Sequence, residues 1–283
     1  MSAPTITRPP IASATGESHA PILSPTQEQV VVIYASVVFI VVISALWHIP
    51  GARTLINPLK LFTIGWHELC HMAAAIFTGG RITSISIDPN TGGCTRVEGG
   101  HPPTILAAGY LGSTLLGAGL IVAAWDTLAA KIASFPVAIG LAVPLILVRD
   151  VFTIILIVIY EALLIGFWFI NHADALRYYC LFLGIMSIFF VVWDFTDDRF
   201  FKKLNDSDAT QFSLLYPKVP AHYWATGWLV LSSLVFIGML LLGIAVFKVE
   251  LQVNAHPHDF VQALTSQIQD QMAEEAAIFL PTR

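Results

Sequence analysis

The chain has 283 residues, of which 56% are hydrophobic and only 12% charged, and its mean hydropathy is +0.73. Since a soluble domain carries about 25% charged residues, this composition indicates an integral membrane protein. The formal net charge of -5 and the lack of a basic stripe argue against a nucleic-acid partner. Three widely spaced cysteines, an odd number, predict no disulfide framework.

The N-terminal region changes character near residue 29. Residues 1–28 are rich in Pro, Ser, Thr and Ala without a periodic apolar pattern, which favours a disordered tail. The apolar run from Val30 to Trp47 then predicts the first membrane helix. Because no basic segment with a short apolar core and cleavage site precedes it, we expect a signal anchor rather than a removable signal peptide.

The second apolar helix carries an H-E-x-x-H motif, residues 67–71. Positions i and i+4 share one helix face, so His67 and His71 can direct two imidazoles at one cation. Glu68 is the neighbour that zinc hydrolases use as the general base toward the metal-bound water. The alternative is a chance match in which both histidines bond to backbone carbonyls. We favour the metal site because the motif lies on the helix that the mechanism requires.

A segment with strand periodicity follows this helix. Residues 81–87 alternate apolar and polar side chains, 88–93 have turn chemistry, and 94–97 can return as a second strand. We therefore predict a β-hairpin. Since exposed strand edges are not tolerated against lipid, it should lie in an aqueous or protein-walled cavity beside the metal site. There it could pair with an extended substrate; the alternative is an ordinary surface hairpin.

Further apolar runs follow, at residues 104–125, 132–148, 151–170, 176–193 and 224–247. Counted against the roughly 20 residues needed to cross a bilayer, the chain is predicted to cross about seven times. Small residues four apart, such as Ala108 and Gly112, predict that the 104–125 helix packs closely on another, which we expect to be the His67/His71 helix.

These elements predict an all-α multi-pass transmembrane bundle with a small β-hairpin inserted after the metal-binding helix. The membrane domain is expected at residues 29–250, followed by a polar C-terminal tail at 251–283. Apolar residues in that tail recur at three- and four-residue steps and indicate a short amphipathic helix; they are Val261, Leu264, Ile268 and Met272.

The orientation in the membrane is indicated by a basic cluster at residues 199–203. With seven spans, this cluster favours a cytoplasmic N-terminus under the positive-inside rule. The same loop contains a glycosylation sequon, Asn205-Asp206-Ser207. Modification of Asn205 in cells would contradict this topology.

A third metal ligand must come from a later part of the chain, because catalytic zinc usually takes three protein ligands and leaves one position for water. We predict Asp194, which ends the apolar run 176–193. Asp197 and Asp198 lie on the same helical face three and four residues on and are the alternatives.

The ordered motifs resemble the intramembrane zinc metalloproteases of the site-two protease type, peptidase family M-50, and most closely their fungal and plant B-like branch. The resemblance covers roughly Asn57 to Asp208. Its motifs are Gly65-Trp66-His67-Glu68-x-x-His71, Thr78-Gly79-Gly80, Asp88-Pro89-Asn90-x-Gly92-Gly93, Gly109-Tyr110-Leu111-Gly112-Ser113, Trp193-Asp194-x-x-Asp197-Asp198 and Ser207-Asp208-Ala209.

This resemblance implies a Zn2+ ion bound by His67, His71 and an acid on a later helix, with Glu68 activating water. The partners it implies are the lipid bilayer and a membrane-protein or transmembrane-peptide substrate, cut within the membrane. Better-known members place the third ligand in an Asn-Pro…Asp-Gly context, which this chain lacks. The assignment to Asp194 therefore rests on the Trp-Asp motif and on helix placement. Several short spans favour an early endomembrane, the ER or Golgi of a eukaryote.

Two other classes of function fit the same sequence. A catalytically silent membrane chaperone or trafficking adaptor could retain the fold, and its metal content would distinguish it from a protease. A metal-ion carrier usually distributes its ligands along a pathway, whereas these ligands cluster at one point. The sequence carries no signal for an oligomeric state.

Overall fold

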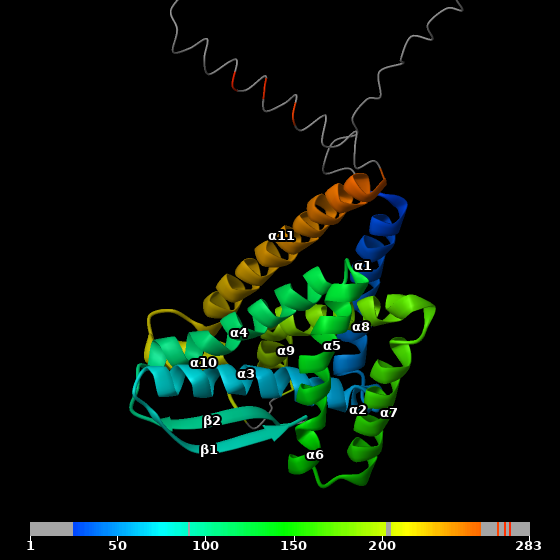
Figure 1. Ribbon diagram of the computed structural model, residues 1–283. Coiled ribbons are helices and arrows are strands. Elements are labelled where there is room, and N and C mark those ends of the chain that lie inside the picture. Colours follow the sequence, from blue (N-terminus) through cyan, green and yellow to red (C-terminus); the bar gives the residue numbers. More distant parts are fainter. Residues whose placement is uncertain are drawn as a thin grey trace, which may run out of the picture.

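The computed structural model describes residues 25–89, 91–201 and 205–255, together with the single residues 265, 269 and 272. This part of the chain forms a helical bundle with one two-stranded sheet (Figure 1). The elements in chain order are α1 Gln27–His48, α2 Ala52–Leu55, α3 Asn57–Phe77, β1 Arg81–Asp88, β2 Gly92–Glu98, α4 Pro102–Ala123, α5 Thr127–Ala142, α6 Pro144–Leu147, α7 Val151–Phe167, the 3-10 turn η1 Asn171–Ala173, α8 Asp174–Ile188, α9 Phe190–Arg199, α10 Asp208–Leu215 and α11 Ala221–Ala255. The predicted multi-pass helical bundle with a small hairpin is confirmed.

Helix α4 lies at the centre of the bundle, between α3 and α8. Glycines make these close approaches possible. A Cβ at Gly112 would collide with the Cys70 side chain of α3, and one at Gly117 would lie 2.6 Å from the Gly184 carbonyl oxygen of α8. The predicted packing of the 104–125 helix on the His67/His71 helix is therefore confirmed, and the same small residues also admit α8.

Fewer helices qualify as membrane spans than the sequence suggested. Among the described residues, four are long and apolar enough: α1, α4, the stretch 127–146 and the part of α11 at 221–247. A fifth span results if α7 and the segment 171–188, which are bent by 93° at their junction, count as one. The prediction of about seven counted these two runs separately. It also counted α3, which does not qualify.

The hairpin follows α3 as predicted. Strands β1 and β2 pair antiparallel from Arg81 opposite Glu98 to Asp88 opposite Gly92. Strand β2 begins two residues before the predicted Cys94, at Gly92, whose φ of +84° is tolerated best by glycine. The hairpin packs on α3, which runs between it and α4 (Figure 1).

The two ends of the chain are described only in part. Helix α1 begins at Gln27, inside the predicted N-terminal tail, with a capping box formed by Thr26 and Gln29. Helix α11 continues to Ala255, past the predicted start of the C-terminal tail. The predicted amphipathic helix lies outside the described residues, apart from single positions.

Candidate metal centre

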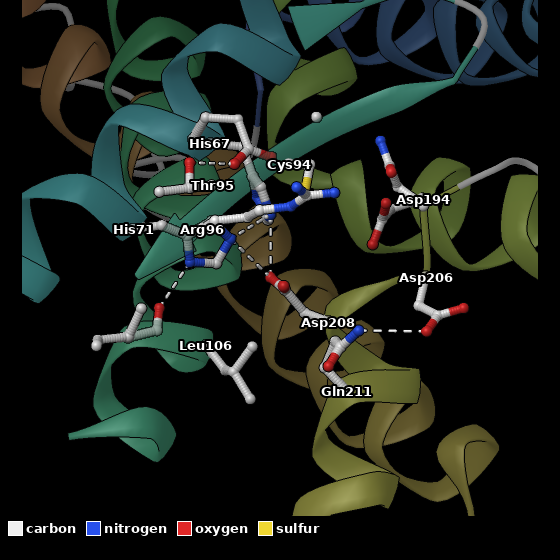
Figure 2. Close-up of a pocket in the computed structure, with 14 residues that line it drawn as sticks. His67, His71, Cys94, Thr95, Arg96, Leu106, Asp194, Asp206, Asp208 and Gln211 are labelled. Atoms are coloured by element: carbon white, nitrogen blue, oxygen red, sulfur yellow. Dashed lines mark hydrogen bonds and ion pairs between the residues drawn. The ribbon is translucent and has the colours of Figure 1, made fainter. Parts of the chain in front are cut away.

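Three side chains that could hold a metal ion meet in the interior, and they are His67, His71 and Asp208. The Nε2 atoms of the two histidines are 3.0 Å apart. The Asp208 Oδ2 atom lies 3.0 Å from Nε2 of His67 and 3.1 Å from Nε2 of His71. All three residues are buried, and Figure 2 shows their side chains converging on one point.

Two separate helices bring these groups together. His67 and His71 lie one turn apart on α3, as predicted. Asp208 is the first residue of α10, and Ser207 caps this helix by accepting a hydrogen bond from the Thr210 amide at 3.3 Å. The third donor therefore comes from a short helix that starts after the loop that follows α9.

Hydrogen bonds on the far side of the rings orient the imidazoles. His71 Nδ1 lies 2.6 Å from the Ile105 carbonyl oxygen, and His67 Nδ1 lies 3.2 Å from the Ser113 hydroxyl, both on α4. Because a carbonyl oxygen can only accept, His71 donates through Nδ1, which leaves Nε2 directed toward Asp208. Histidines that bind metals are oriented in this way.

The donor set fits a zinc ion. Ligands at about 2.0–2.1 Å in a tetrahedral site lie about 3.3 Å from one another, close to the observed spacing. Apart from the ring nitrogens, no hydrogen-bond donor among the described residues reaches the buried Oδ2 of Asp208. A Cβ at Gly109 would collide with both imidazole rings, so glycine leaves the room that these rings occupy. A cation between the three donors could be bound by all of them at once.

The Asp208 carboxylate is held in its ionised form. Burial raises the pKa of this carboxyl, but His71 and His67 have the larger combined effect and lower it well below its usual range. One carboxylate and two imidazoles are a donor combination used by catalytic zinc sites.

Glu68 lies against the hairpin, next to the cluster. Its Oε2 accepts a hydrogen bond of 2.6 Å from the hydroxyl of Thr95 on β2, and it is only 5% exposed. A Cβ at Gly93 would collide with the Glu68 carboxylate, so β2 can approach this side chain only because residue 93 is glycine. The predicted position of the hairpin beside the metal site agrees with this contact.

A cavity of about 430 Å³ borders the cluster and Glu68. Its walls come from α3, β2, the start of α4, α9 and the region around α10. The lining residues are His67, Glu68, His71, Gly93, Cys94, Thr95, Arg96, Ile105, Leu106, Asp194, Asn205, Asp206, Asp208 and Gln211. The cavity is large enough for part of a peptide to reach the three donors and Glu68 together.

Asp194, the predicted third ligand, does not belong to the three-donor group, in which Asp208 takes that place. Asp194 lies beside the cluster (Figure 2), where its Oδ2 accepts a hydrogen bond of 2.7 Å from the Tyr110 hydroxyl. The two alternatives also have other partners, because Asp197 accepts from the Trp47 indole and Asp198 from Ser207 and Thr210. In the sequence, a serine followed by an acid at 207–208, a typical helix start, is the feature that marks Asp208.

The sequon residues are engaged within the fold. The Asn205 side-chain amide donates to the Thr91 carbonyl oxygen at 3.2 Å, and Asn205 lines the cavity. Ser207 is completely buried, and its hydroxyl donates to Asp198 at 2.7 Å. A glycan on the Asn205 amide would compete with its hydrogen bond to Thr91 and crowd the cavity that Asn205 lines.

We therefore expect the protein to carry no glycan at Asn205 when it is made in glycosylation-competent cells. Glycosidase treatment should leave its electrophoretic mobility unchanged, and the Asn205→Gln variant should migrate like the wild type. A glycosidase-sensitive shift that disappears in the Asn205→Gln variant would contradict both the packing of this loop and the predicted orientation.

Among the described residues, four to five apolar helices are long enough to span a membrane, and two histidines and one carboxylate lie close enough to share a metal ion, which together indicate an integral membrane protein with a candidate metal site. The profile of one protein family, described as Peptidase M50B-like, matches residues 32–239. Since that match covers well over half of the chain, including every residue of the cluster, the chain belongs to this family of proteases. No curated protein and no solved structure gave a match.

Proposed function

We propose that the chain is a zinc-dependent endopeptidase that hydrolyses peptide bonds of membrane-spanning substrates in an endomembrane such as the ER or Golgi. One observation carries the proposal: three donor atoms within 4.8 Å of one another lie beside Glu68 in a single cavity. The family match supports proteolysis, and the convergence of these residue types supports a metal-dependent reaction.

In this proposal His67, His71 and Asp208 hold the ion. Zinc bound there would lower the pKa of a water molecule and polarise the scissile carbonyl. Glu68 accepts the proton of the attacking water and passes it to the leaving amine, the general acid–base role that a buried carboxylate beside the reacting atoms can fill. Thr95 fixes the rotamer of Glu68 through its hydroxyl.

The hairpin supplies the surface on which a substrate segment could extend. Four consecutive residues of β2, from Gly93 to Arg96, line the cavity. In a two-stranded sheet each strand keeps one unpaired edge, and an extended peptide can add to such an edge through main-chain hydrogen bonds. Pairing with β2 would unwind a substrate helix locally and bring its peptide bonds to Glu68.

Metal removal tests the proposed function. The purified chain should contain one zinc ion per molecule and cleave a transmembrane peptide in lipid nanodiscs. A chelator such as 1,10-phenanthroline should abolish cleavage, and added zinc should restore it, because the proposed reaction requires the bound metal. A non-chelating phenanthroline isomer is the matched control. Full cleavage by a chain stripped of metal would refute the proposal, and a chain that holds zinc but cuts no peptide would favour a silent adaptor.

A further inference from the structure

Two carboxylates of α9 lie one helical turn apart and both reach toward α10. Asp194 and Asp198 are at positions i and i+4, so they share one face of this helix. Asp198 contacts Ser207, the residue before Asp208, and Asp194 contacts Ala209, the residue after it, through Tyr110. These contacts therefore bear on how the third donor of the metal centre is held in place.

Asp198 holds the residue before Asp208. Its Oδ2 accepts hydrogen bonds from the Ser207 amide at 3.1 Å, from the Ser207 hydroxyl at 2.7 Å and from the Thr210 hydroxyl at 2.6 Å. Three donors on one carboxylate oxygen fix both the N-cap and the first turn of α10. Ser207 is completely buried, so water cannot substitute for these bonds.

Asp194 holds the residue after Asp208 through Tyr110. The Tyr110 hydroxyl donates to Asp194 Oδ2 at 2.7 Å and accepts from the Ala209 amide at 3.3 Å. Tyr110 is 2% exposed, and its ring centroid lies 5.4 Å from that of His67. Tyr110 therefore contacts both the backbone next to Asp208 and the imidazole of His67.

We propose that Asp194 and Asp198 are positioning residues of the metal centre: they clamp the backbone on both sides of Asp208 so that its carboxylate meets the two imidazoles. The inference rests on the proposed function, in which Asp208 is the third zinc ligand. The clamp has a physical reason. Helix α10 has only eight residues and follows a loop, so its first residue, Asp208, needs anchors to stay in place. The need is greater because a second buried carboxylate, Glu68, lies in the same site and repels Asp208.

Zinc affinity of the full-length protein in detergent, measured by chelator competition, tests the clamp. Asp198→Ala and the milder Tyr110→Phe should each weaken zinc binding about 10- to 100-fold, the range seen when partners of metal ligands are removed. Asp197→Ala is the matched control. It lies beside Asp198, but its hydrogen bond is to Trp47 of α1 rather than to α10, so its zinc affinity should match the wild type.

Two further readouts separate positioning from general destabilisation. Cobalt in place of zinc should give an altered visible absorption spectrum in Asp198→Ala and Tyr110→Phe but not in Asp197→Ala, since only the first two displace a ligand. In an Asp208→Ala background, the clamp substitutions should cause no further loss of zinc affinity, because they act through Asp208.

The outcomes that overturn the inference are distinct. Wild-type zinc affinity and cobalt spectra in both clamp variants would overturn it, as would an equal loss of affinity with and without Asp208. In either case zinc binding by the wild type would leave the proposed function intact. A wild-type chain that binds neither ion would overturn the proposed function and this inference together.

Discussion

Replacing Glu68 with Gln is expected to slow cleavage on the order of 10²- to 10⁴-fold while leaving zinc bound, because a positioned general base contributes about that much. Glutamine has nearly the same shape, and its amide oxygen can still accept the Thr95 hydroxyl. It cannot take up a proton. The loss should therefore appear in kcat on a transmembrane peptide, with the zinc content of the purified variant unchanged.

A matched control separates proton transfer from side-chain placement. Thr95→Val removes the hydroxyl that donates to Glu68 at 2.6 Å but keeps the carboxylate. Its effect should lie at or below the lower end of that range, about 10- to 100-fold, since the loss of one hydrogen bond to a charged group costs roughly 1.5–3 kcal/mol and each 1.4 kcal/mol is tenfold. Equal rates for Glu68→Gln and the wild type, both with zinc bound, would exclude Glu68 as the base.

The two histidines of the site could be predicted from sequence because their placement depends only on residues close together in the chain. His67 and His71 are four residues apart on one helix, so helical geometry alone places them on one face. The hairpin was equally accessible, since alternation over residues 81–87 is a short-range signal. Its contact with Glu68 depended on Gly93, whose role appears only once β2 is packed against α3.

The third donor could not be fixed by the same reasoning. Asp194, Asp197 and Asp198 share a helix with strong motif character, and helix placement favoured the first of them. The structure shows instead that their oxygens accept hydrogen bonds from other parts of the fold, and that Asp208 begins the next helix. Which acid reaches the imidazoles depends on the path of the loop between α9 and α10, and loop paths are set by tertiary contacts such as those of Asp198.

The number of spans illustrates a related limit. Apolar length alone predicted separate crossings for the runs at 151–170 and 176–193, but a 93° bend separates α7 from α8. The left-handed backbone of Asn171, His172 and Ala173 makes that bend. Helix α3 contains buried polar residues, among them Lys60 and Glu68. A count of apolar runs treats such residues as brief interruptions and still scores the helix as one membrane span.

A series of Asp→Asn substitutions is expected to separate the metal ligand from its neighbours by zinc affinity. Asp208→Asn should weaken zinc binding roughly 100- to 1,000-fold. Zinc sites bind with about 10–16 kcal/mol shared by four ligands, so one ligand contributes about 3 kcal/mol, and each 1.4 kcal/mol is tenfold. Chelator competition on the purified variants measures this loss.

The same substitution should have much smaller effects at the other two positions. Asparagine at 194 keeps an oxygen that can accept the Tyr110 hydroxyl, so Asp194→Asn should weaken binding about tenfold or less. Asp197→Asn changes the partner of the Trp47 indole, away from the three donors, and should bind zinc like the wild type. If Asp194 were the ligand, the ranking of Asp194→Asn and Asp208→Asn would invert. A single affinity series thus decides between the acid favoured by the Trp-Asp motif and the acid that the fold brings to the two imidazoles.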